Sequence, residues 1–191
     1  MTSQTQYWNR LIQPGIVALV GAGGKTTVLS KLVEYGRLQG QPIVVTTTTQ
    51  LYESQVAQYE PIYTKDINDV DEYCTKRIQQ GYCGAWFNGI TRTKVDAVDC
   101  ESIDGLSALH PNWQIVVEAD GAKEKWLKAP KHTEPVIPSQ TKTTIGVVNL
   151  QMLGASLDED HVHNLELVQS IVHREEAAIV TPHMLALTIL E

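Results

Sequence analysis

The sequence predicts an α/β fold with a mainly parallel sheet covered by helices on both faces. Three observations carry this prediction: short apolar runs alternate with segments of helical periodicity, a glycine-rich loop follows the first run, and acidic residues follow a later one. Parallel strands that are buried on both faces are continuous apolar runs, and crossover helices cover the sheet that they form. We expect a single domain over residues 1–191, a length sufficient for one compact core.

The first quarter of the chain supplies two strands and a helix. Residues 16–20, Ile-Val-Ala-Leu-Val, predict a strand that is buried on both faces. Apolar residues within 25–39 recur at helical spacing and Gly40 follows them, so we expect a helix that ends there. Residues 43–45 predict the next buried strand, which runs into threonines at 46–49.

The middle of the chain has weaker patterns. Residues 61–64 fit a short strand, residues 69–80 fit a helix, and residues 102–109 fit a helical turn. The runs 85–87 and 94–98 flank Asn88-Gly89, a strong turn signal, and we therefore expect a small β-hairpin insertion. Residues 115–117 predict a third buried strand.

Beyond residue 121 the periodicity is lost. Residues 123–142 are rich in Lys, Pro and Thr, and a long loop of this kind within a domain is typical of a functional segment. We expect strands at 144–150 and 177–180, with a helix at 160–173 between them. Pro182 favours the first turn of a last helix, a position that proline tolerates.

Charge and composition restrict the classes of partner. The net charge is -7, whereas a face that grips nucleic acid is usually basic, so we expect no nucleic-acid partner. No apolar run approaches ~20 residues, and the N-terminus lacks the apolar segment of a secretory signal. We therefore expect no membrane partner and a cytoplasmic location. The cysteines fit no zinc spacing and are expected to be free thiols; they are Cys74, Cys83 and Cys100.

The glycine-rich loop predicts a phosphate-binding site. It matches the second half of the Walker A pattern GxxxxGK[ST], while Leu19 occupies the position of the first glycine. Small residues let backbone N–H groups turn toward phosphate oxygens, and the following helix presents its N-terminus to the anion. The alternative is a strand-to-helix turn that binds nothing. We expect Mg²⁺ and ATP or GTP as cofactors, bound by Gly21, Ala22, Gly23, Gly24, Lys25, Thr26 and Thr27.

An acidic segment follows the third predicted strand. Glu118 and Asp120 are two residues apart, so in an extended chain their side chains point to the same side. A magnesium–nucleotide site needs a carboxylate near the metal or the attacking water. We expect Thr26, Glu118 and Asp120 to hold the metal, and Lys25, Glu118 and Asp120 to be the catalytic residues. The alternative is that both acids only cap the next turn.

Other polar residues are candidates for a second ligand. Thr48 and Thr49 end the second predicted strand, next to the loop, although a threonine run also fits β-propensity alone. A lysine cluster in the long loop indicates an anionic ligand or merely a solvated loop. That cluster consists of Lys123, Lys125, Lys128 and Lys131.

His161 and His163 form a possible metal pair in the sequence. We expect them to lie on a helix, where side chains two residues apart face different directions. A surface pair is therefore expected in place of a metal site.

Several segments together form a recognisable pattern. They are Val-Gly-Ala-Gly-Gly-Lys-Thr-Thr at 20–27, Val-Thr-Thr-Thr-Thr at 45–49, Val-Glu-Ala-Asp-Gly-Ala at 117–122, Leu-Lys-Ala-Pro at 127–130, His-Thr-Glu-Pro-Val-Ile-Pro at 132–138 and Leu-Asp-Glu-Asp-His-Val at 157–162. Their order and spacing resemble the YqeC family, proposed accessory proteins of selenium-dependent molybdenum hydroxylases. The resemblance covers most of the chain from residue 17 to residue 182.

This resemblance implies a P-loop NTPase-like protein that binds and hydrolyses a nucleoside triphosphate during maturation of a selenium-dependent molybdenum hydroxylase. That enzyme or its cofactor would be the partner, and Lys128, His132 and Glu134 would lie at the substrate site. Cys83 and Cys100 would either handle selenium as thiolates or be inert buried thiols. The family generally continues past this C-terminus into an Asn-Lys-x-Asp-like segment that helps to choose the base, so we expect a truncated chain or a shortened member.

Two other functions remain open. The glycine loop and Glu118-Ala119-Asp120 are also similar to the ATP loop and acidic strand end of Mur-type amide ligases, which activate a carboxylate with ATP. Those enzymes hold the incoming amino acid on a further domain, for which 191 residues leave no room. The other function is a non-catalytic switch that binds nucleotide and reports it to a partner.

Overall fold

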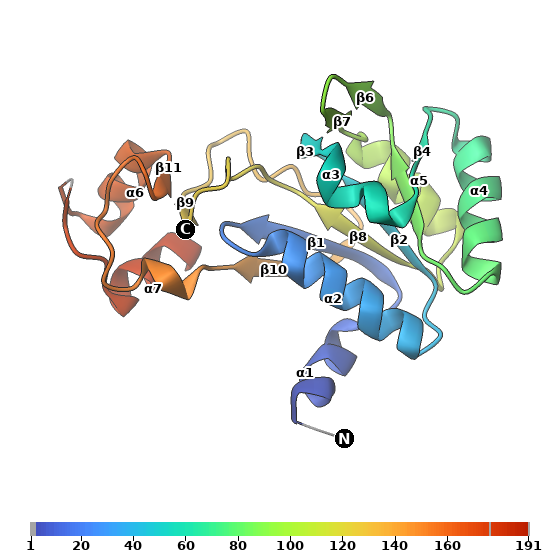
Figure 1. The fold of residues 1–191 in the computed structure, drawn as a ribbon, viewed down its shortest axis with the longest axis horizontal. Coiled ribbons are helices and arrows are strands. Elements are labelled where there is room, and N and C mark those ends of the chain that lie inside the picture. The colour runs from blue at the N-terminus through green and yellow to red at the C-terminus, as the bar shows by residue number, and fades with distance from the viewer. Residues whose placement is uncertain (1–2, 176, 191) are drawn as a thin grey trace.

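A parallel sheet forms the centre of the computed structural model, which describes residues 3–175 and 177–190 (Figure 1). Within these residues the sheet has six strands in the order β10-β1-β8-β2-β5-β4, and every neighbouring pair is parallel. The strands are β1 (Gly15–Gly21), β2 (Ile43–Thr47), β4 (Ile62–Tyr63), β5 (Gly84–Phe87), β8 (Gln114–Glu118) and β10 (Thr141–Val147).

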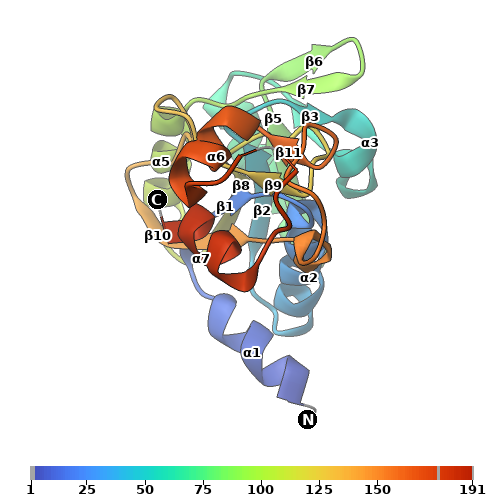
Figure 2. The ribbon, with the colours of Figure 1, turned by 90° about the vertical axis from the view of Figure 1, so that its left-hand side faces the viewer.

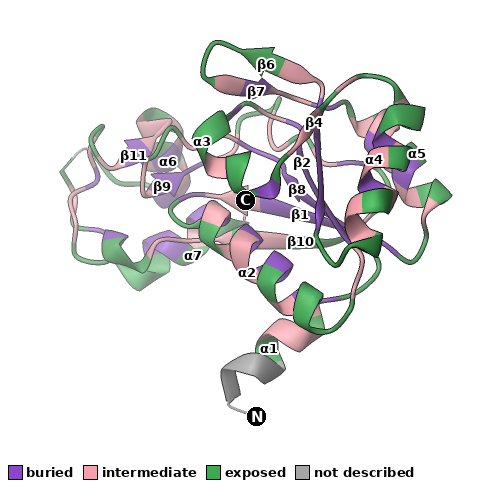
Figure 3. Cartoon of the chain, turned by 45° about the vertical axis from the view of Figure 1, so that its right-hand side comes forward, coloured by how far each residue is buried: buried purple, intermediate pink, exposed green. Residues whose placement is uncertain are grey.

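Helices cover both faces of this sheet, as the alternation of apolar runs predicts. Alternate residues of β1 face opposite sides: Val17 and Leu19 belong to one hydrophobic cluster, Ile16 and Ala18 to the other. The first cluster includes residues of α2 (Lys25–Leu38), and helix α1 (Ser3–Leu11) packs against it. The second includes residues of α4 (Ile67–Gln79) and α5 (Cys100–Leu109). Figure 3 shows the buried strands between helices whose outer sides are exposed, so the expected α/β fold is confirmed.

A smaller group of elements, the C-terminal group, lies beyond the carboxyl ends of the strands (Figures 1 and 2). Its short strands β9 (Leu127–Lys128) and β11 (Val162–His163) pair in parallel. Around them lie η2 (Leu150–Met152), α6 (Leu165–Val172) and α7 (Pro182–Leu190). These elements contribute to a third hydrophobic cluster, separate from the two that sandwich the sheet. The group therefore has its own apolar interior.

The predicted hairpin exists, but its predicted position is wrong. Strands β6 (Gly89–Thr91) and β7 (Lys94–Asp96) are antiparallel and turn at Arg92-Thr93, where Arg92 has φ 59°. β3 (Leu51–Tyr52) pairs with the other edge of β7. Residues 85–87 instead belong to β5, because Trp86 and Phe87 are fully buried in the two main clusters. Burial of these aromatic side chains outweighs the local turn signal of Asn88-Gly89.

Two further predictions near the C-terminus are wrong. Residues 177–180 form no strand; Ile179 makes only an isolated antiparallel bridge with Ser156. Helix α6 begins at Leu165 and not near residue 160, because Val162 and His163 pair with β9.

The N-terminal helix α1 was not predicted, because the N-terminus is polar. It packs Trp8 on Tyr35 with ring centroids 5.7 Å apart.

No helix within the described residues has the length and apolarity needed to cross a membrane.

Candidate functional site

The glycine loop connects β1 to α2 at the carboxyl end of the sheet. Gly21 has φ 97°, and a Cβ atom there would lie 2.3 Å from the carbonyl oxygen of Val147 on β10. Gly24 has φ 142° and precedes the first turn of α2, where it supplies no side-chain cap. Because the first N–H groups of a helix have no partner within the helix, this end of α2 presents free donors and a positive dipole. Only glycine fits the backbone at Gly21.

Lys25, Glu118 and Asp120 form a buried charged cluster beside this loop. Their exposed fractions are 5%, 6% and 3%. Lys25 Nζ donates to the carbonyl oxygen of Gly21 over 2.6 Å, and it lies 2.9 Å from Asp120 Oδ1 and 3.7 Å from Glu118 Oε1. Strand β8 lies between β1 and β2, with Glu118 in register with both Leu19 and Thr47. Both carboxylates thus reach the same ammonium group, as their spacing predicts.

Asp120 joins the acidic strand end to the glycine loop. Its Oδ2 accepts a hydrogen bond of 2.9 Å from the backbone N–H of Gly21. Its Oδ1 has no hydrogen-bond partner among the described residues, and its contact with Lys25 is an ion pair without hydrogen-bond geometry. Asp120 is thus bonded to the loop backbone through one oxygen and paired with Lys25 through the other.

Lys128 extends the cluster on the side of the C-terminal group. Its Nζ lies 3.4 Å from Asp120 Oδ2, donates to the carbonyl oxygen of Gly121 over 2.7 Å, and pairs with the carboxylate of Glu134. Because its side chain is only 1% exposed, Lys128 is a buried partner of Asp120 and Glu134. It is not part of an open lysine surface.

The environment raises the pKa of Glu118 to about 7. Burial is the main cause, and the negative charge of Asp120 acts in the same direction, while Lys25 opposes both. Two hydrogen bonds to its carbonyl oxygen fix the backbone at this position; they come from Thr47 Oγ1 over 2.8 Å and from the N–H of Thr48 over 3.1 Å. Glu118 is therefore poised to gain or lose a proton near neutral pH.

A cavity of about 560 Å³ opens beside the charged cluster. This volume lies within the usual range of small-molecule sites. The glycine loop and the start of α2 form one wall, and the hairpin, the segment after β8 and β11 form the others. The lining residues used below are Gly23, Gly24, Lys25, Thr26, Thr49, Tyr52, Gln55, Lys94, Glu118, Gly121, Lys123, Lys125, Glu134 and His163.

Some residues expected at the site lie outside this cavity. Thr27 and His132 are exposed, and neither lines it. Thr48 is buried and donates to the carbonyl oxygen of Val136 over 2.6 Å, so it holds the segment after β9 against the sheet. Gly21 and Ala22 line a different, mainly apolar pocket of about 200 Å³, which Asp120 and Lys128 also border.

Several lining residues were not predicted as site residues, among them Tyr52, Gln55, Lys94 and His163. Gln55 donates to Thr26 Oγ1 over 3.3 Å, and Lys94 lies 5.1 Å from the ring centroid of Tyr52. No local motif marks any of them, because the separate segments that carry them reach the loop only in the folded chain.

The histidine pair lies in a different setting from the one expected. His163 is on β11 and not on a helix; burial and the nearby Lys123, Lys128 and Lys131 lower its pKa. His161 instead bonds Asp158, with 2.6 Å between its Nδ1 and Oδ1 of the carboxylate. In the described part of the chain, no three His, Cys, Asp or Glu side chains gather into a possible metal centre.

The two cysteines considered for selenium chemistry are not activated. Cys83 is buried, Cys100 is partly buried, and burial raises the pKa of both thiols. A raised pKa reduces the thiolate fraction, which favours the inert interpretation.

Comparison with known proteins identifies the family. The profile described as YqeC protein matches residues 17–166. The uncharacterized protein YqeC of Escherichia coli (strain K12) is 30% identical over 152 residues, which cover 79% of this chain and 58% of that relative. No solved structure matches the chain. The family profile spans the glycine loop, the acidic strand end and the segment after it, and the chain belongs to the YqeC family.

Proposed function

We propose that this protein binds a nucleoside triphosphate with Mg²⁺ and hydrolyses it. The observation that carries the proposal is the buried cluster of Lys25, Glu118 and Asp120 between a glycine loop and an open cavity. Burying three charged groups is costly unless they serve one another or a ligand. Here they meet at the N-terminus of a helix, a place that favours anions.

The residues present fit such a ligand. Gly23 and Gly24 line the cavity directly before α2, where the absence of side chains lets a phosphate approach the backbone. Asp120 Oδ1 lies 2.9 Å from Lys25 Nζ and would become available to a metal-bound water once Lys25 turns to the phosphate. Thr26, whose hydroxyl already accepts from Gln55, and Asp120 would hold the metal. Since Mg²⁺ keeps several waters and takes phosphate oxygens, one or two protein ligands are sufficient.

The chain's own residues then account for hydrolysis. Lys25 exchanges its bonds with Gly21 and Asp120 for phosphate oxygens, and the first N–H groups of α2 stabilise the same negative charge. Glu118, with a pKa of about 7, accepts the proton of the attacking water. The metal, when bound, supplies charge neutralisation at the transferred phosphoryl group.

The biological role that we propose follows from the family resemblance: maturation of a selenium-dependent molybdenum hydroxylase in the cytoplasm. The partner would be that enzyme or its cofactor. Lys123 and Lys125, which line the cavity, support an anionic partner molecule there.

Phosphate release in the presence of Mg²⁺ and ATP or GTP tests the proposed hydrolysis. In Glu118→Gln we expect kcat to fall about 100-fold or more, the usual contribution of a general base, while nucleotide affinity changes less than about threefold. Lys25→Ala, which removes the phosphate contact, sets the background. A wild-type rate no higher than that of Lys25→Ala would contradict hydrolysis by this site.

A second candidate function is ATP-dependent activation of a carboxylate. One observation favours it: the cavity continues beyond the loop to Lys94, Lys123 and Lys125, which would attract a second anion. Activation predicts that an added carboxylate substrate accelerates phosphate release and that hydroxylamine traps the acyl phosphate as a hydroxamate. Nucleotide binding without any turnover would instead favour a non-catalytic switch.

A further inference from the structure

His163 lines the cavity at the glycine loop, and its imidazole ring has no hydrogen-bond partner among the described residues. It lies on β11 in register with Lys128 of β9, so the two side chains point to the same side of this pair of strands. His161, two residues earlier, is bonded to Asp158 over 2.6 Å. The imidazole of His163 instead keeps its donor and its acceptor for a molecule in the cavity.

Positive charge surrounds this imidazole. Burial lowers the pKa of His163, and three nearby lysines act in the same direction while Glu134 opposes them; the lysines are Lys123, Lys128 and Lys131. Glu134 is already paired with Lys128. Among the described residues no ion pair includes Lys123 or Lys131. The environment of His163 therefore has an excess of positive charge, although the net charge of the chain is -7.

The whole lining of the cavity has the same excess. Its acidic residues are Glu118, Glu124 and Glu134. Glu118 lies beside Lys25, and Glu134 is paired with Lys128, so Glu124 is the acid that remains. Against it stand three lysines of the lining outside the buried cluster, which are Lys94, Lys123 and Lys125. Clefts lined by one sign of charge concentrate ligands of the opposite sign.

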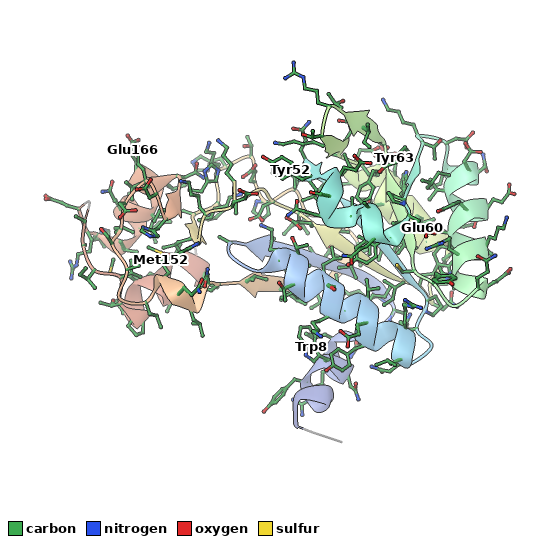
Figure 4. The ribbon with its side chains drawn as sticks, viewed as in Figure 1. Trp8, Tyr52, Glu60, Tyr63, Met152 and Glu166 are labelled. Atoms are coloured by element: carbon green, nitrogen blue, oxygen red, sulfur yellow. The ribbon has the colours of Figure 1, made fainter. Side chains whose placement is uncertain are left out.

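The hairpin wall of the cavity adds an aromatic surface. Tyr52 is at the end of β3, where Figure 4 labels it, and its side chain is 41% exposed. Lys94 of β7 holds its ammonium group 5.1 Å from the centroid of this ring. A cationic wall and an aromatic wall in one cavity suit an organic molecule that carries an acid group.

We propose that this cavity binds a second substrate beside the nucleotide, a small organic molecule whose carboxylate or phosphate group is held by His163 and Lys123. The oxygen atoms of that group accept hydrogen bonds from the imidazole and the ammonium group, and charged bonds of this kind are the stronger ones. The body of the molecule extends toward Tyr52. This inference rests on the proposed function, since the nucleotide phosphates take the side of the cavity at the glycine loop and leave β11 and the hairpin to the second molecule.

An NMR titration of the histidine ring signals with benzoate and with phenyl phosphate tests this site. The chain has six histidines, and His163→Ala identifies the signal of His163. We expect at least one probe to shift this signal to saturation, and the comparison of the probes identifies the preferred acid group. His163→Ala should weaken binding about tenfold and Lys123→Ala about threefold. His183→Ala, which removes an exposed histidine of α7, should leave the affinity unchanged.

The pH dependence provides a second readout. Affinity for benzoate should rise as the pH falls through the pKa of His163, because the imidazolium adds a positive charge to the site. Bound benzoate should raise that pKa by about one unit, which corresponds to about tenfold tighter binding by the protonated form. Glu118 has a pKa of about 7 and lines the same cavity, so the profile is also recorded in Glu118→Gln, where it should persist.

Lys25→Ala separates this site from the nucleotide site, since it should bind both probes like the wild type. The inference is overturned if neither probe shifts the signal of His163 to saturation, if His163→Ala and Lys123→Ala bind like the wild type, or if Lys25→Ala abolishes probe binding. The signal in the unaltered protein locates the probe even if a variant folds poorly. Nucleotide binding without probe binding would refute this inference alone, whereas probe binding at His163 without nucleotide binding would support the site and contradict the proposed function.

Discussion

Charge balance around Lys25 explains the unusual state of Glu118. Three carboxylates, from Glu118, Asp120 and Glu134, share two buried lysines, Lys25 and Lys128. If Glu118 is protonated, the two remaining carboxylates balance the two lysine ammonium groups. Burial, which disfavours an unmatched charge, therefore acts on Glu118 and raises its pKa to about 7. A bound cation at this place would favour the ionised form of Glu118.

The first prediction concerns the pH dependence of stability. The pKa of Glu118 is about 7 in the folded chain, against a reference of 4.5, so between these values the folded state binds more protons than the unfolded state. The free energy of unfolding should therefore fall as pH rises from about 4.5 to about 7, by up to about 3 kcal/mol at 1.4 kcal/mol per pKa unit. Glu118→Gln should remove this loss. Denaturant unfolding of both proteins at pH 5 and pH 8 measures it, and parallel pH profiles would contradict the assignment.

The second prediction concerns Gly21. Gly21→Ala would place a Cβ atom 2.3 Å from the carbonyl oxygen of Val147, so the loop and β10 must separate. We expect a cost of about 3 kcal/mol, typical of combined strain and overpacking, together with loss of nucleotide binding. Gly40→Ala is the matched control, because Gly40 has φ 70° but open space around its Cβ position. It should cost only about 1 kcal/mol, the price of a left-handed conformation. Equal effects of the two variants would argue against a close-packed loop.

Short elements carry part of the site, and Lys128 on β9 is the clearest case. β9 and β11 contain only two residues each, yet they place Lys128 against Asp120 and His163 against the cavity. Lys128 therefore acts as a positioning residue between the C-terminal group and the acidic end of β8.

The third prediction tests this connection. Lys128→Met keeps the length and apolar stem of the side chain but leaves Asp120 and Glu134 without their shared cation. Removing one partner of a buried ion pair typically costs about 3–5 kcal/mol, and we expect a loss in that range by denaturant unfolding. Lys131→Met, an exposed lysine of the same segment, is the control and should change stability by less than about 0.5 kcal/mol. Similar losses of stability in both variants would show that the charge of Lys128 does not stabilise the fold.

Long apolar runs made the central strands predictable. Short elements, and elements that depend on contacts between distant parts of the chain, were not predictable. Residues 16–20, 43–45 and 115–117 all lie in buried strands, because a run that is apolar on both faces has no stable place at the surface. The hairpin was misplaced because the burial of Trp86 and Phe87 overrides a local turn signal. β9 and β11 are too short to leave a periodic pattern.

The residues of the candidate site also divide into predictable and unpredictable ones. Lys25, Thr26, Glu118 and Asp120 were predictable, since a loop and a strand end carry them as contiguous motifs. Gln55, Lys94 and His163 reach the cavity from three separate elements, and only the folded chain brings them there.

At the scale of the whole molecule, the topology brings separate segments to one edge. Because β1, β8 and β2 are parallel neighbours, the glycine loop, Glu118 and the threonine run meet at their carboxyl ends. The C-terminal group lies beyond this edge, and its His163 closes one side of the cavity together with Glu134 of the segment after β9 (Figure 1). Four lysines of this acidic protein line that cavity, where we propose that anions bind: Lys25, Lys94, Lys123 and Lys125.

The proposed function depends on nucleotide binding, which calorimetry of ATP and GTP with Mg²⁺ measures. We expect saturable binding of one or both nucleotides by the wild type, and the comparison identifies the base. Lys25→Ala should weaken this binding at least about 100-fold, as expected for the loss of a charged contact worth about 3 kcal/mol. Lys31→Ala, an exposed lysine of the same helix, should bind like the wild type. Absence of binding in the folded wild type, or equal affinity in Lys25→Ala, would contradict nucleotide binding at this loop.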